Sequence, residues 1–130
     1  MDTRQPLRIS GVVLDAPDPA DLAAFYRALL GWETEHEDEG WVKLRSPHGG
    51  AGLAFQRDDE YVSPVWPGRT AEQRMMSHLD IQVDGLDAEV ARAVALGARL
   101  ADHQPQEDVR VLIDPVGHPF CMWDPAELTG

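Results

Sequence analysis

The chain repeats one pattern of turns and apolar residues, with an offset of 66 to 68 residues between the two copies. Three landmarks keep this register: a position in the first strand, the glycine that follows a helix, and the proline of a late turn. They are the pairs Gly11 and His78, Gly31 and Gly97, and Pro47 and Pro115. The chain has 130 residues, which is about one domain. Each copy is therefore a half-size module of that domain.

The first copy has the pattern of a strand, a helix and three further strands. Apolar residues at helical spacing predict a helix over Ala20–Leu30, with Asp18 as its N-cap and Gly31 as its C-terminal cap. Short β-branched or alternating segments predict the strands. These segments are Arg8–Asp15, Trp32–Glu37, Trp41–Arg45 and Gly52–Gln56.

The second copy repeats this order. Its helix is predicted over Leu86–Leu96 and ends at Gly97. Its predicted strands are Ser77–Val83, Ala98–Gln104, Val109–Ile113 and Phe120–Trp123. The chain then reads as one domain, with module one at about residues 7–57, a linker at 58–75 and module two at about 76–125.

One helix can cover only one face of a small sheet, so a single βαβββ module leaves the other face open. We therefore expect an α+β fold in which two tandem βαβββ modules form a curved mixed sheet, with helices on the convex side and a concave cleft. Strand edges and apolar sheet surface that the two helices do not cover also predict a homodimer.

Charge and composition exclude several classes of function. The chain carries 11 basic and 23 acidic residues, and its net charge of −12 repels nucleic acids and anionic membranes. A phosphate-binding GxxxxGK[ST] loop is absent, and the only lysine, Lys43, is not expected to form a Schiff base. The single cysteine, Cys121, and an N-terminus without a secretion signal indicate a cytoplasmic protein.

Three segments carry a resemblance to a known family. They are GVVLDAPDPADLAAFYRALLGW, SHLDIQVDGLDAEVARAVALGARL and IDPVGHPFCMWDP. Together they resemble the vicinal oxygen chelate superfamily, which includes glyoxalases, extradiol dioxygenases and bleomycin-resistance proteins. The resemblance implies that metal ligands come from the first and fourth strands of each module. In this chain those positions are Gly11, Leu53, His78 and Cys121.

These positions predict that the protein holds no metal cofactor. Only His78 and Cys121 among them have ligand atoms, whereas a catalytic zinc site normally has three protein ligands. Gln56 becomes a further candidate if the register of the fourth strand slips. The metal-dependent lyase or dioxygenase activity of the relatives is therefore the least favoured function.

Strand alternation predicts which side chains line the cleft. In SHLDIQV the polar residues His78, Asp80 and Gln82 share one face, and the apolar residues share the face that meets the helix. We expect the ligand-binding residues to come from both modules and from the linker. They are Val13, Leu53, Phe55, Trp66, His78, Cys121 and Trp123.

The main hypothesis is a protein that binds a small organic molecule in this cleft, with His78 and Asp80 as a metal-independent acid–base pair. A structural hydrogen bond between the same two residues is the alternative. Cys121 is interpreted as a small buried hydrophobe, and Trp66 either packs on the sheet or stacks on a ligand. The rival hypothesis is a resistance-type protein that sequesters a toxic compound without converting it.

Overall fold

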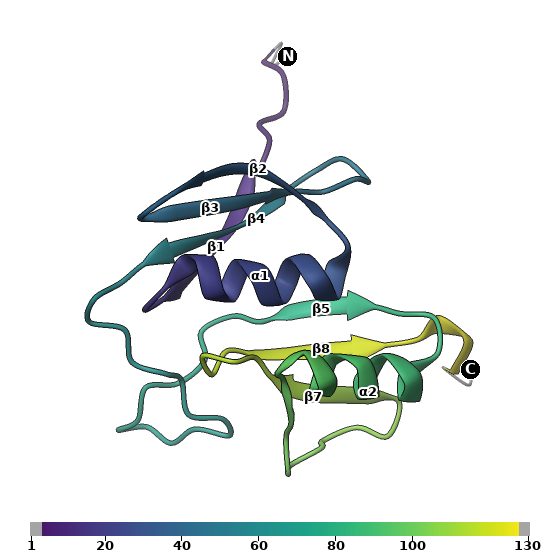
Figure 1. Cartoon of the computed structure of the whole chain (residues 1–130). Coiled ribbons are helices and arrows are strands. Elements are labelled where there is room, and N and C mark those ends of the chain that lie inside the picture. The colour runs from purple at the N-terminus through teal and green to yellow at the C-terminus, as the bar shows by residue number, and fades with distance from the viewer. Residues whose placement is uncertain (1–3, 128–130) are drawn as a thin grey trace. The chain divides into compact units, whose positions relative to one another are not determined.

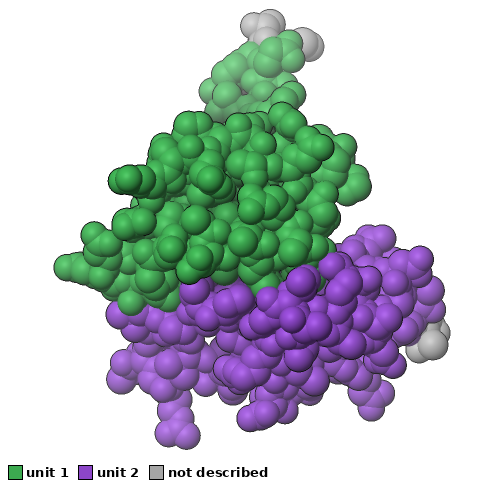
Figure 2. Space-filling model, viewed as in Figure 1, with its two compact units in different colours: residues 1–61 green, residues 62–130 purple. Residues whose placement is uncertain are grey.

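The computed structural model describes residues 4–127 and divides into two compact units, Met1–Tyr61 and Val62–Gly130 (Figure 2). The boundary falls inside the predicted linker. Most of that linker, from Val62 onward, belongs to the second unit. Each unit contains one copy of the sequence repeat.

Unit 1 forms a four-stranded sheet and one helix (Figure 1). The sheet has the order β1-β4-β3-β2, in which β1 is parallel to β4 and the other neighbours are antiparallel. The predicted βαβββ order is confirmed. The elements are β1 (Gly11–Ala16), α1 (Pro19–Leu30), β2 (Glu33–Asp38), β3 (Trp41–Arg45) and β4 (Gly52–Arg57).

Unit 2 repeats this topology with the order β5-β8-β7-β6 (Figure 1). The parallel pair is now β5 with β8, so the internal duplication and the α+β class are confirmed. Each module forms its own mixed sheet. The elements are β5 (Leu79–Gln82), α2 (Leu86–Leu96), β6 (Arg99–Leu100), β7 (Val109–Ile113), β8 (Pro119–Trp123) and a 3₁₀ turn, η1 (Pro125–Glu127).

Strand β6 is much shorter than the predicted Ala98–Gln104 because a side chain takes over its pairing. The Gln104 amide donates to the Ala101 and Val111 carbonyls at 2.8 and 2.9 Å, and its oxygen accepts the Val111 N–H at 2.8 Å. The Val111 carbonyl still accepts the Ala101 N–H at 3.0 Å, but the Val111 N–H, which a longer β6 would use, bonds to the glutamine side chain instead.

The two helices begin in different ways. Asp18 caps α1, as predicted, by accepting the Ala20 N–H at 3.0 Å. Gly85 precedes α2 and has no side chain that could cap it. Instead the buried Asp124, at the end of β8, accepts the Gly85 N–H at 2.7 Å and the Ala126 N–H at 2.8 Å. This carboxylate fixes the start of α2 relative to β8.

The core of unit 1 lies between α1 and its sheet. Tyr26 of α1 stacks on Phe55 of β4 with ring centroids 5.5 Å apart, and both rings are fully buried. Because strand side chains alternate, Leu53 shares this helix side with Phe55. The prediction that Leu53 and Phe55 line a cleft opposite the helix is therefore wrong.

This error has a physical cause in the sequence of β4. Four consecutive residues, from Gly52 to Phe55, are buried, so the strand has no polar alternation to reveal its faces. Cys121 pairs with Asp80, and the matching pair in unit 1 is Ala54 with Val13. The counterpart of Cys121 is therefore Ala54, one residue beyond the predicted Leu53.

Unit 2 confirms the alternation predicted for β5. Leu79 and Ile81 pair with Phe120 and Met122, which are buried on the side of the sheet that meets α2. The opposite side of each sheet is called its helix-free face. In unit 2 this face carries Asp80, Gln82, Val111, Ile113, Cys121 and Trp123, and in unit 1 it carries Gly11, Val13, Trp41, Lys43, Gly52, Ala54 and Gln56.

Within residues 4–127, neither helix has the length and apolar character that crossing a lipid bilayer requires.

Candidate functional site

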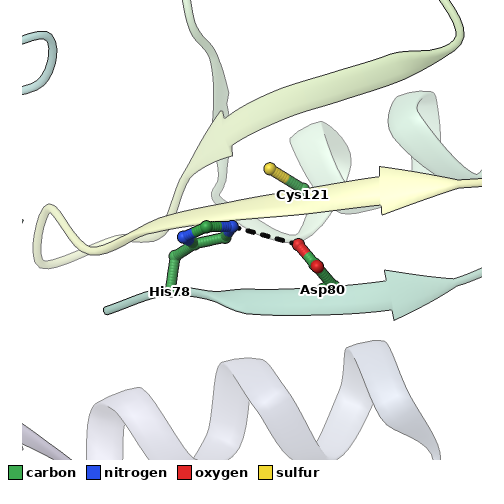
Figure 3. A group of neighbouring side chains, drawn as sticks. All are labelled: His78, Asp80 and Cys121. Atoms are coloured by element: carbon green, nitrogen blue, oxygen red, sulfur yellow. Dashed lines mark ion pairs between the residues drawn. The ribbon is translucent and has the colours of Figure 1, made fainter. Parts of the chain in front are cut away.

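Three polar side chains meet on the helix-free face of unit 2 (Figure 3). Asp80 and Cys121 are register partners on β5 and β8. His78 comes just before the first residue of β5, and its ring lies beside Asp80 (Figure 3). One ligand atom from each residue lies within 4.8 Å of the other two. These residues, His78, Asp80 and Cys121, are called the polar trio.

His78 Nε2 lies 3.1 Å from Asp80 Oδ1, a contact that becomes an ion pair when the imidazole is protonated (Figure 3). The side chain of His78 is 37% exposed and that of Asp80 is 65% exposed, so a ligand can reach both. When the ring proton is on Nε2, beside the carboxylate, Nδ1 is left as an acceptor. This geometry suits an imidazole whose orientation a carboxylate fixes.

The third member of the trio is a neutral thiol. Burial raises the pKa of Cys121, and the negative charge of Asp80 and its hydrogen bond to the thiol raise that pKa further. A raised pKa keeps the thiolate fraction small at neutral pH, and the thiolate is the nucleophilic form. In the metal-free protein Cys121 is therefore not set up as a nucleophile.

We expect Cys121 to react slowly with iodoacetamide at pH 8, with a rate–pH profile displaced to higher pH than that of an ordinary cysteine. Asp80→Asn removes the second and third causes of the shift, so its profile moves part of the way back. The measurement is alkylation followed by mass spectrometry between pH 6 and 10. Equal profiles for the two proteins would contradict the role of Asp80.

An aromatic side chain packs on the same buried cluster as Cys121. Trp66 packs against the buried cluster of Ala101, Val111 and Ile113, which Cys121 also contacts. The His103 ring lies 5.6 Å from the Trp66 ring, centroid to centroid. Trp66 is half-buried, so it packs on unit 2 and keeps part of its ring exposed.

Five of the predicted site residues share unit 2. Register places Trp123 on the same face as Asp80 and Cys121, two residues along β8. Trp66 packs on the cluster that Cys121 also contacts, so unit 2 combines polar and aromatic side chains, a composition typical of small-molecule sites. The other predicted residues belong to unit 1. Val13 lies on the helix-free face there and is 43% exposed, whereas Leu53 and Phe55 lie in the core.

The polar trio has the composition of a site for a borderline divalent ion such as Zn²⁺. It offers one imidazole nitrogen, one carboxylate oxygen and one thiol sulfur, which gives three protein ligands and leaves a fourth position open. The two-ligand count from the sequence omitted Asp80. The corresponding positions of unit 1, Gly11 and Ala54, offer no ligand atom.

Comparison with known proteins gives a consistent result. The chain matches the family model described as a glyoxalase-like domain over residues 11–123. No curated protein sequence matches it.

Solved structures share the fold at low sequence identity. A glyoxalase/bleomycin resistance protein/dioxygenase family enzyme from Burkholderia phytofirmans has 19% identity and a TM-score of 0.71, over 91% of this chain and 98% of that chain. A glyoxalase/bleomycin resistance protein from Albidiferax ferrireducens has 20% identity and a TM-score of 0.63, over 89% and 97%. A lactoylglutathione lyase from Agrobacterium tumefaciens has 18% identity and a TM-score of 0.61, over 94% and 96%. The chain belongs to the glyoxalase-like domain family, within the vicinal oxygen chelate superfamily.

Proposed function

We propose that the protein binds a small organic molecule on the helix-free face of unit 2 and that His78, oriented by Asp80, acts on it as a general base. The observation that carries this proposal is the exposed contact of His78 Nε2 with Asp80 Oδ1, at 3.1 Å, on a face where Cys121 and Trp66 pack on one buried cluster. Such a contact gains little stability on an exposed surface, so its place among polar and aromatic side chains supports a ligand contact.

The chemistry assigns one role to each residue. Asp80 holds the Nε2 proton, Nδ1 of His78 accepts a proton from the ligand, and the carboxylate stabilises the imidazolium that results. Trp66 and Trp123 supply flat apolar surface for the body of the ligand. The substrate class is thus a small molecule with an acidic C–H or O–H group and an apolar or planar part.

A sequestering protein is the rival within the same site. The net charge of −12 attracts cationic compounds, and two of the structural neighbours are described as members of a family that includes bleomycin resistance proteins. The two functions differ in the fate of the ligand: an enzyme converts it, whereas a sequestering protein returns it unchanged.

A metal centre is a second candidate, favoured by the convergence of three ligand atoms within 4.8 Å. An ion held by His78, Asp80 and Cys121 would occupy the imidazole lone pair. The same histidine could not then serve as a base, so the two candidates exclude each other.

The experiment for the main proposal is native mass spectrometry of the protein as purified. We expect a retained organic mass that is absent from His78→Ala, while the variant unfolds at the wild-type urea concentration because His78 contributes little to the core. Leu79→Ala is the matched control, because Leu79 points to the helix side. It should keep the ligand and lose about 2 kcal/mol of stability. Equal ligand retention in both variants would contradict the proposal.

The same measurement with added Zn²⁺ distinguishes the second candidate. The acid–base proposal expects no stoichiometric zinc. A one-to-one zinc complex that is lost in Asp80→Ala and Cys121→Ala, but kept in Gln82→Ala, would replace that proposal with the metal centre. Gln82 is the control because it lies on the same strand and the same face as Asp80.

A further inference from the structure

The only lysine of the chain lies on the helix-free face of unit 1. Lys43 pairs with Ala54 on β4, and its neighbours Val42 and Leu44 are fully buried on the helix side. Its side chain is 22% exposed. Lysine is among the residues least often buried, so a side chain this covered needs a reason.

Two glycines form the surface beneath this side chain. Gly11 and Gly52 are register partners on β1 and β4. A Cβ atom at Gly52 would lie 3.0 Å from Lys43 Cε and 2.6 Å from the Leu44 carbonyl oxygen, so the fold itself requires glycine there.

Gly11 differs from Gly52 because the fold does not require it. A Cβ atom there would make only ordinary contacts, 3.5 Å from the Gly52 carbonyl oxygen and 3.7 Å from Lys43 Cε. Glycine within a strand costs stability and often marks a position where a ligand approaches. Gly11 therefore leaves free a volume beside Lys43 that a side chain would fill.

The ammonium group has one ion-pair partner among residues 4–127. A bulge between Thr34 and His36 interrupts the β2–β3 register, and Glu35 in this bulge lies with Oε2 3.4 Å from Lys43 Nζ. Charge-assisted hydrogen bonds are normally about 2.7–2.9 Å long. An ammonium has three donors, so this long contact leaves donors for another acceptor.

We propose that Lys43 binds the carboxylate of a small organic anion over Gly11 on unit 1. This is a binding site beyond the proposed function, since it shares no residue with the polar trio. The Lys43 side chain lies on the sheet of unit 1, and its compact ammonium group offers one positive charge. The net charge of −12 opposes multivalent anions more strongly than a monoanion, which favours a monocarboxylate over a phosphate dianion.

The single lysine makes a direct measurement possible. Protein labelled with ¹³C-lysine gives one ε-methylene signal, from Lys43 alone. We expect sodium acetate to shift this signal saturably, and we expect acetamide or the same concentration of sodium chloride to leave it unchanged. A shift of equal size with all three additives would overturn the proposal, because it would report ionic strength or solvent only.

Four variants test the geometry, with the amide signals of Ala54 and of its neighbour Val13 on β1 as a common readout. Glu35→Gln removes the ion-pair partner of the Lys43 ammonium. It should tighten acetate binding by about fivefold, a factor that corresponds to the strength of one weak surface ion pair. Lys43→Met should weaken it by about 10- to 100-fold, as expected for a lost charged hydrogen bond. Gly11→Ala should weaken it without unfolding the protein. Glu33→Gln is the control, because Glu33 pairs with Arg45 at 3.3 Å on the same two strands.

Two results would refute the site. One is an unchanged acetate affinity in Glu35→Gln. This variant keeps Lys43, so the result stands even if Lys43→Met does not fold. The other is an equal effect of Glu33→Gln and Glu35→Gln, which would show that only the overall charge matters.

Discussion

Phe55→Ala is expected to lower the free energy of unfolding by about 3–5 kcal/mol, the usual cost of emptying a buried aromatic site. Phe55 is fully buried and stacks on Tyr26, so the substitution removes both apolar burial and the ring contact between α1 and β4. Because the ring points to the helix side, the affinity of any ligand on the helix-free face should not change. Urea denaturation and the acetate titration measure the two effects separately.

The matched control for Phe55 is Val13→Ala on the other side of the same sheet. Val13 is 43% exposed, so its truncation should change stability by no more than about 0.5 kcal/mol. If Val13→Ala proved as destabilising as Phe55→Ala, the assignment of the two faces of this sheet would be wrong.

Asp114→Ala is expected to cost about 3–5 kcal/mol for a different reason. Asp114 is only 3% exposed, and its Oδ1 accepts the N–H groups of Val116, Gly117 and His118 at 3.0, 3.0 and 2.9 Å. Removal of the carboxylate takes this acceptor from three backbone donors of the β7–β8 turn, although the Gly117 N–H keeps the Asp114 carbonyl at 3.0 Å. A hydrogen bond to a charged group contributes about 1.5–3 kcal/mol. The measurement is again urea denaturation.

The duplicated sequence supplies the control for Asp114. Ser46 occupies the equivalent turn of unit 1, and its Oγ accepts the His48 N–H at 3.2 Å. Ser46→Ala should therefore cost about 1 kcal/mol or less. Asp114→Asn keeps one acceptor oxygen and should fall between the two. Equal losses in Asp114→Ala and Ser46→Ala would show that the turn does not depend on the buried carboxylate.

Most of the fold could be predicted because its signals are local. The periodicity of α2 and the alternation of β3 and β7 gave their observed bounds, Leu86–Leu96, Trp41–Arg45 and Val109–Ile113. The length of β6 could not be predicted, because it depends on where the Gln104 side chain bonds. This error arose where a side chain, rather than a strand, bonded to a backbone group of β7.

The candidate site shows the same division. The polar face of β5 was predictable from alternation, but the meeting of Asp80 with Cys121 depends on the pairing of β5 with β8, strands about 40 residues apart in the chain. The face of β4 was not predictable, because that strand is buried on both sides. The alternation in WVKLR does place Lys43 opposite Val42 and Leu44, and that signal was available in the sequence.

The duplicated topology gives each unit one equivalent row of side chains across its helix-free face. In unit 2 the row is Asp80, Cys121 and Val111, and in unit 1 it is Val13, Ala54 and Lys43. The two rows differ in chemistry: the row of unit 2 contains a carboxylate and a thiol, and the row of unit 1 contains an ammonium group. Neither row contains the polar groups of the other. A chain assembled from two copies of the second module would carry the polar trio twice and no lysine, and would be a chemically different protein with the same topology.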